Sequence, residues 1–365
     1  MFGILPAKYY IDVYLLLVTL ITFIVIRPYP MYGMERISDQ YKENVSSTVL
    51  LAVIIILFIG LRPVSGVFMD MGGYAMAWDS YHYDGFNKDE QNFLFDNLRF
   101  FMSDAGFSYT SFFLLIALIY FGCMAWACRE LFPQDTLIAF LVCLAAFSTF
   151  SYGTNGIKAG SAASIFLVAI AMKDKGKTIL AIVFLIISLG FHHSMVLPIA
   201  SFAVCLFVKK PRLYRYLWIA CFIIALLHIK FFQNLFAGFV DDHSAGYLLG
   251  EEIRHETFGG FRIDFILYSA APIFVGWWFE SKKLVQSESY SFVLNVYTMI
   301  NAMWLLCMYA SYTNRIAYLS WLMYPIVLIY PFLKLEAFPD QYRMFKNVVI
   351  CHLCFTLFMV FIYYA

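Results

Sequence analysis

Charged residues are scarce in this chain of 365 residues, and hydrophobic residues dominate it. Only 13% of the residues are charged, against about 25% in an ordinary soluble domain, whereas 62% are hydrophobic. A soluble fold cannot bury so much apolar surface, but a lipid bilayer solvates the outer faces of helices directly. The composition therefore excludes an ordinary soluble protein and predicts an all-α polytopic integral membrane protein.

Strong net charge, a disulfide framework and metal-ligand clusters are lacking as well. A net charge of +1 gives no reason to expect nucleic acid as a partner. Nearly all eight cysteines fall within apolar runs, which argues against disulfides. Cys351 and Cys354 have C-x-x-C spacing but no second pair nearby, and a structural zinc site needs four ligands. Asp241 and Asp242 form an acidic pair that we expect to face water. We therefore expect no metal and no cofactor.

Apolar runs long enough to cross a bilayer recur along the chain, without an internal repeat. A spanning helix needs about 20 largely apolar residues. About twelve such runs lie near residues 9–26, 47–64, 109–128, 136–150, 157–172, 178–191, 194–208, 214–230, 263–279, 290–310, 315–333 and 346–364. The first lacks a basic start and a small-residue cleavage motif, so we expect a retained helix. Residues 1–365 are predicted to form a single transmembrane domain.

The distribution of lysine and arginine predicts the orientation. With the N-terminus outside, 16 of the 25 basic residues fall in cytoplasmic loops, as the positive-inside rule requires. Two outer segments, residues 65–108 and 231–262, are too polar to span. They are predicted to be long extracytoplasmic loops, and such loops are often functional.

Several outer basic residues lie at helix ends, where the positive-inside rule does not explain them. Arg62 ends the second expected helix, Lys158 opens the fifth and Arg315 opens the eleventh, while Arg254 lies in the second outer loop. A charge at such a depth is costly unless it is paired or faces a wet cavity. Arginine and lysine there suit a phosphate-bearing lipid headgroup. The alternative is plain snorkelling of each side chain to the interface.

Histidine and carboxylate residues on the same face provide candidates for proton transfer and sugar binding. His192 and His193 occupy an outer turn between two apolar helices, and an imidazole there can act as a general base. The alternative is an ordinary turn histidine. The first outer loop holds aromatic rings beside carboxylates, a combination that suits carbohydrate but is also common in loops. Its candidate residues are Asp70, Tyr74, Trp78 and Asp79.

The order of these features resembles the EpsG/Wzy-type polysaccharide polymerase family of bacterial membranes. The resemblance rests on four motifs between about residues 50 and 330: Arg62 with Gly66, Asp70 and Tyr74; Asn155 to Ala162 around Lys158; His192-His193-Ser194; and Asn314-Arg315-Ile316. The family usually has arginine where this chain has Lys158, and its Gly-x-Asp motif is stretched here.

The resemblance implies a helical bundle similar to GT-C glycosyltransferases, in the bacterial cytoplasmic (inner) membrane with an outward-facing active site. Such polymerases join oligosaccharide repeat units carried on undecaprenyl pyrophosphate into capsule, exopolysaccharide or O-antigen. A flippase and a chain-length regulator are further partners that it implies. The resemblance then implies that the pyrophosphate is bound by Arg62, Lys158 and Arg315, with Arg254 as a lid residue. The candidate base is His192, then His193, then Asp70, and sugar binding falls to Tyr74, Trp78 and Asp79.

Two other functions fit the same residues. A transporter or flippase of lipid-linked oligosaccharide would also combine many helices with buried cations, but it should show internal repeats and broken helices. The sequence indicates neither. An O-antigen ligase-like transferase or a membrane acyltransferase would share the cations and the histidines. A ligase would transfer the chain to a different acceptor.

Overall fold

The computed structural model describes residues 5–27, 38–87, 91–229, 260–282, 284, 287–310, 313–335, 338 and 340–364. Every regular element in these ranges is a helix. Contacts divide the chain into two units. One comprises residues 1–192 and 332–365, and the other comprises residues 193–331. The predicted loop 231–262 lies almost wholly outside the described residues.

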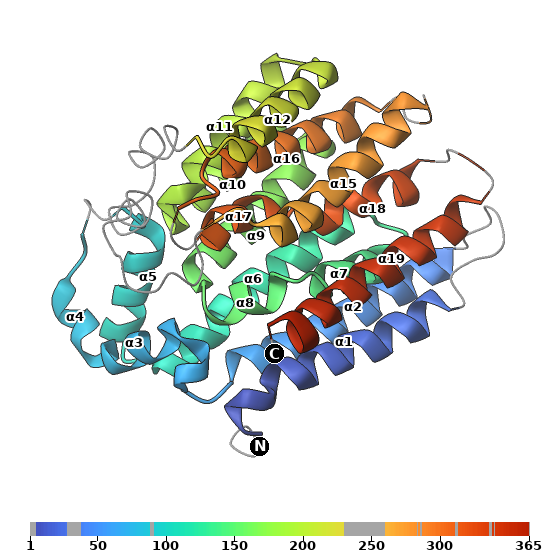
Figure 1. Cartoon of the computed structure of the whole chain (residues 1–365). Coiled ribbons are helices and arrows are strands. Elements are labelled where there is room, and N and C mark those ends of the chain that lie inside the picture. The colour runs from blue at the N-terminus through green and yellow to red at the C-terminus, as the bar shows by residue number, and fades with distance from the viewer. Residues whose placement is uncertain are drawn as a thin grey trace. The chain divides into compact units, whose positions relative to one another are not determined.

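The first unit is built around α6, α9 and α10, which pack side by side (Figure 1). Its helices are α1 (Tyr10–Ile26), α2 (Ser38–Gly60), α3 (Asp70–Met76), α4 (Tyr81–Asp84), α5 (Phe93–Asp104), α6 (Tyr109–Leu131), α7 (Thr136–Leu144), α8 (Thr149–Thr154), α9 (Ile157–Asp174), α10 (Thr178–Phe191) and α19 (Gln341–Phe358). Nearly every residue of α9 from Gly160 onward is buried. The centre of this unit is therefore apolar and closely packed.

The second unit consists of α11 (Val196–Phe207), α12 (Pro211–Leu226), α15 (Ile263–Ser281), α16 (Glu288–Leu306), α17 (Thr313–Trp321) and α18 (Tyr324–Lys334), whose last three residues count with the first unit. Helix α16 packs against α11, α12 and α17. Trp218 Nε1 on α12 donates to Asn301 Oδ1 on α16 at 2.8 Å, so polar groups as well as apolar contacts join these helices.

The expected helical membrane protein is confirmed at the level of its class. Among the described residues, four helices are long and apolar enough to cross a membrane: Ala7–Ile26, Tyr109–Leu131, Thr313–Lys334 and Gln341–Tyr363. Three further apolar helices are shorter. Helix lies in all twelve expected ranges, but the number of membrane crossings stays a prediction.

The expectation of one uninterrupted helix is wrong for the range 136–150, which forms α7 and α8 with a break between them. The range 315–333 comprises α17 and α18, which together form the apolar span Thr313–Lys334. Pro325 near the start of α18 suits the first turn of a new helix. At the end of α7, side chains from three other helices form hydrogen bonds with the carbonyls that have no donor within the helix. The carbonyls of Val142, Cys143, Leu144 and Ala145 are bonded by His352, Thr149, Tyr14 and Thr356, respectively.

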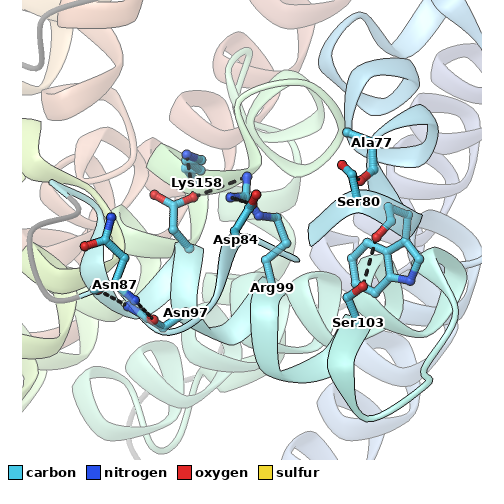
Figure 2. A network of polar contacts seen from close by, with 10 residues as sticks. Ala77, Ser80, Asp84, Asn87, Asn97, Arg99, Ser103 and Lys158 are labelled. Atoms are coloured by element: carbon cyan, nitrogen blue, oxygen red, sulfur yellow. Dashed lines mark hydrogen bonds and ion pairs between the residues drawn. The ribbon is translucent and has the colours of Figure 1, made fainter. Parts of the chain in front are cut away.

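Residues 65–108, expected as a loop, contain the three helices α3, α4 and α5. Two side chains of α5 hold the preceding segment in place. Asn97 donates to the carbonyl of Asn87 at 2.9 Å, and Ser103 donates to the carbonyl of Trp78 at 2.8 Å (Figure 2). The described residues of this segment therefore form short helices between α2 and α6.

Candidate functional site

Arg62 follows α2 and is almost completely buried, with 4% of its surface exposed. Its guanidinium donates to the carbonyl of Ile59 at 2.7 Å and to that of Thr154 at 2.9 Å. These carbonyls lie at the C-terminal ends of α2 and α8, where the helix dipole favours a cation. The rings of Phe68 and Phe113 lie within 5.2 and 5.4 Å of the guanidinium carbon. Arg62 therefore ties two helix ends together.

The guanidinium of Arg62 carries a positive charge, because arginine is not deprotonated in proteins. Among the described residues, no carboxylate forms an ion pair with it. Its charge is balanced by backbone dipoles and aromatic faces rather than by an acid.

Glycines bring the end of α8 and the start of α9 close together. A Cβ at Gly160 would lie 2.6 Å from the carbonyl oxygen of Tyr152, and one at Gly156 would lie 3.0 Å from the Tyr152 ring. The small residues around Lys158 are thus explained by this tight turn. We call residues 154–157 the α8–α9 junction. Arg62 bonds to its first residue, and Lys158 directly follows its last.

Lys158 lies in the first turn of α9 and forms an ion pair with α5. Its Nζ is 2.9 Å from Asp96 Oδ1 and 5.2 Å from the centre of the Phe95 ring. The Lys158 side chain is 24% exposed, whereas that of Asp96 is only 7% exposed. Helix α9 has no side-chain cap at its N-terminus. Lys158 is therefore a cation that solvent can reach, beside a nearly buried acid.

A second cation, Arg99, contacts the same acid. Arg99 Nη1 lies 3.5 Å from Asp96 Oδ1, and Arg99 Nη2 lies 3.6 Å from Asp84 Oδ2 (Figure 2). Its guanidinium carbon lies 3.8 Å from the centre of the Tyr81 ring. Burial raises the pKa of Tyr81, and the nearby Arg99 opposes that shift. We call Asp84, Asp96, Arg99 and Lys158 the Asp96 cluster.

The formal charges of the Asp96 cluster cancel, with two cations against two carboxylates. The prediction of site residues included Lys158 but missed Asp96 and Arg99. Their i, i+3 spacing was visible in Asp96-Asn97-Leu98-Arg99, but it is informative only if that stretch is helical. Because residues 65–108 are expected from the sequence to form a loop, the spacing of Asp96 and Arg99 does not predict an ion pair.

Helix α5 reaches α9 because α10 leaves room for it. A Cβ at Gly190 of α10 would lie 2.6 Å from Cγ of Leu94, so only glycine permits this approach. Phe95 packs against Phe191 at 6.3 Å between ring centres. Gly190 and Phe191, which directly precede the His192-His193-Ser194 motif, therefore serve to dock α5.

His192 is the next residue and caps the C-terminal end of α10. Its side chain is half-buried, and its backbone N–H donates to the carbonyl of Ser188 at 3.1 Å. The fold thus brings His192 to the same end of the first unit as Phe191 and α5. Its role as a base stays a prediction.

The expected sugar-binding residues differ in their access to solvent. Asp70 and Asp79 are exposed, and Tyr74 is half-buried with its ring 6.0 Å from that of Phe95. Trp78 is only 5% exposed, and its indole N–H donates to the carbonyl of Phe107 at 2.7 Å. A sugar could stack on Trp78 only if that ring moved. Its binding role stays a prediction, as do those of the other three.

The remaining expected residues lie elsewhere. His193 opens the second unit, where Arg315 is an exposed residue of α17. Arg254 and the pair Asp241 and Asp242 lie outside the described residues. Within the described ranges, no group of three or more His, Cys, Asp or Glu residues could hold a metal ion. The first unit thus brings together Arg62 and Lys158 at one junction, and their relation to Arg315 stays a prediction.

The model of the EpsG family matches residues 47–365, which covers both units. The chain belongs to the EpsG family. Membership implies a role of the polysaccharide-polymerase type and confirms the family suggested by the sequence motifs. No curated protein and no solved structure matches this EpsG-family chain.

Proposed function

We propose that this EpsG-family protein joins oligosaccharide repeat units, carried on undecaprenyl pyrophosphate, into a surface polysaccharide at the outer face of the bacterial cytoplasmic membrane. The observation that carries the proposal is the solvent-accessible Lys158 at the N-terminal turn of α9. A helix N-terminus and an adjacent ammonium group together favour an anionic ligand. Family membership makes a lipid-linked sugar the ligand to test first.

The proposed reaction is a glycosyl transfer. A hydroxyl oxygen of the acceptor sugar bonds to the anomeric carbon of the growing chain, and the bond from that carbon to the lipid pyrophosphate breaks. The hydroxyl proton passes to a base, for which His192 is the first candidate, His193 the second and Asp70 the third. Direct displacement of this kind inverts the anomeric centre.

Negative charge develops on the departing pyrophosphate, and fixed cations that face it stabilise the transition state. Lys158 is our first candidate for this contact. Arg62, Arg315 and Arg254 are further candidates, although the buried position of Arg62 also fits support of the α8–α9 junction that carries Lys158. Tyr74, Trp78 and Asp79 are proposed to contact the sugar. A flippase and a chain-length regulator would supply substrate and limit the product.

The test uses the purified full chain with an undecaprenyl-pyrophosphate-linked repeat unit. A ladder of products separated by one repeat unit is expected. Transfer only to a different acceptor would instead indicate a ligase. Movement of the lipid across liposomes without a new glycosidic bond would indicate a flippase. Arg315→Ala should abolish polymer and leave single units, and polymers of normal length in that variant would refute its role.

A further inference from the structure

The Asp96 cluster holds an arrangement that the proposed reaction leaves unexplained. Lys158 from α9 and Arg99 from α5 approach the same oxygen, Asp96 Oδ1, at 2.9 and 3.5 Å. Two cations around one anionic oxygen are also what a phosphate oxygen requires. Because Asp96 already occupies that position, the cations carry no excess charge to attract another anion.

We propose that Asp96 is a displaceable counter-ion, and that Lys158 exchanges it for the pyrophosphate of the lipid-linked substrate. This inference rests on the proposed function, names Asp96 as a positioning residue and adds Arg99 to the pyrophosphate site. Asp96 does not touch the reacting atoms. It acts by setting how strongly Lys158 and Arg99 bind the pyrophosphate.

The side chains differ in their freedom to take part in this exchange. Asp96 is a short side chain, 7% exposed, on a helix that is fixed against α10 through Gly190. Lys158 has a flexible four-carbon stem and is 24% exposed. Arg99 is held by Asp84 and Tyr81. Lys158 is therefore the group that moves, while Asp96 and Arg99 stay in place.

Such an exchange serves product release. Each transfer leaves a lipid pyrophosphate on the enzyme, which must depart before the next cycle. A carboxylate next to the cations competes with the product for Lys158, and it repels a bound pyrophosphate because both groups are negatively charged. The competition weakens binding and speeds release.

The experiment measures binding of farnesyl diphosphate to the full chain in phosphatidylcholine nanodiscs. Asp96→Asn should bind about tenfold more tightly than the natural protein, and Lys158→Gln should lose binding. Asp104→Asn is the matched control, because it removes one exposed carboxylate from the same helix and should shift affinity less than twofold. If Asp104→Asn raises the affinity for farnesyl diphosphate as much as Asp96→Asn does, net charge explains the effect and the proposal is overturned. Unchanged or weaker binding by well-folded Asp96→Asn would also overturn it.

Removal of Asp96 leaves two cations side by side, so this variant can lose stability. The ligand must then raise the thermal midpoint of Asp96→Asn more than that of the natural protein, because the tighter complex gives the larger stabilisation. An equal or smaller rise overturns the proposal. The double variant Asp96→Asn/Lys158→Gln should regain stability but should not bind the diphosphate. A purely structural ion pair would not predict the tighter binding of the single variant Asp96→Asn.

Turnover separates this inference from the proposed function. Asp96→Asn should slow severalfold between its own first transfer and its later turnovers, because the lipid pyrophosphate leaves more slowly, whereas the natural protein should not. If the natural protein makes no polymer while Asp96→Asn still binds the diphosphate more tightly, the polymerase assignment fails and the exchange stands. If the natural protein makes polymer and Asp96→Asn shows normal binding and turnover, the exchange alone fails.

Discussion

Arg62 and Lys158 lie on either side of the same α8–α9 junction, yet their surroundings differ in kind. Arg62 is 4% exposed and, among the described residues, hydrogen-bonds to backbone carbonyls only, whereas Lys158 is 24% exposed and faces a carboxylate. A cation fixed by carbonyls at two helix ends supports the backbone. A cation held by a competing anion can exchange partners. The comparison teaches that position at a helix end does not by itself distinguish a structural from a functional charge.

The largest effect on stability is expected from Arg62→Ala. The change leaves the carbonyls of Ile59 and Thr154 without their donor and removes packing against Phe68 and Phe113. We expect a loss of about 2–4 kcal/mol in the free energy of unfolding, with loss of polymer as a consequence. Unfolding in mixed micelles measures it. A variant of normal stability that makes no polymer would instead assign Arg62 directly to the substrate.

Lys158→Gln should show the opposite pattern. Since the ion pair with Asp96 is partly exposed, its loss should cost at most about 1 kcal/mol of stability. Polymer formation should nevertheless fall by about 100-fold, because the variant lacks the charge that we propose stabilises the leaving pyrophosphate. The repeat-unit ladder and the unfolding midpoint are measured on the same preparation. Normal ladders from Lys158→Gln would show that Lys158, like Arg62, has no direct role in the reaction.

Gly190→Ala tests whether the docking of α5 places Asp96 next to Lys158. The new methyl group would meet Leu94 at 2.6 Å, so either α5 or α10 must shift, at a cost of about 1–3 kcal/mol. Gly122→Ala in α6 is the matched control, because its nearest neighbour would lie at an ordinary 3.8 Å. We expect Gly190→Ala, and not Gly122→Ala, to weaken binding of farnesyl diphosphate. Equal binding by both variants would show that the α5–α10 contact does not position the cluster.

The class of the fold and the family could be predicted from sequence because composition and short motifs carry them. Hydrophobic runs located the helices, and the motifs around Arg62, Lys158 and His192 indicated the EpsG family. The α7–α8 break was missed because residues 136–150 are uniformly apolar or small. Three of its four donors, Tyr14, His352 and Thr356, lie more than 100 positions away, where no local pattern reveals them.

The same limit applies to the site. Lys158 was predicted from its position at a helix start, which is a local property. Asp96 lies 62 positions before it, and the packing of α5 against α10, through Leu94 at Gly190 and Phe95 at Phe191, brings the two helices together. Conversely, aromatic residues beside carboxylates suggested a sugar platform at Trp78, but composition does not tell a buried ring from an exposed one. Burial, not residue type, separates these cases.

The smallest effect is expected at the α7–α8 break. Neutral side chains there donate hydrogen bonds to carbonyls at a helix end, as Arg62 does, so the break compares a neutral donor with a charged one. Tyr14 and Thr356 donate to the carbonyls of Leu144 and Ala145 at 2.8 and 2.7 Å. Hydrogen bonds between membrane helices contribute about 0.6 kcal/mol on average and at most about 1.7 kcal/mol. Tyr14→Phe and Thr356→Val should each lower the free energy of unfolding by that amount, with polymer formation retained. Costs as large as that of Arg62→Ala would show that the charge of Arg62 adds nothing to its support of helix ends.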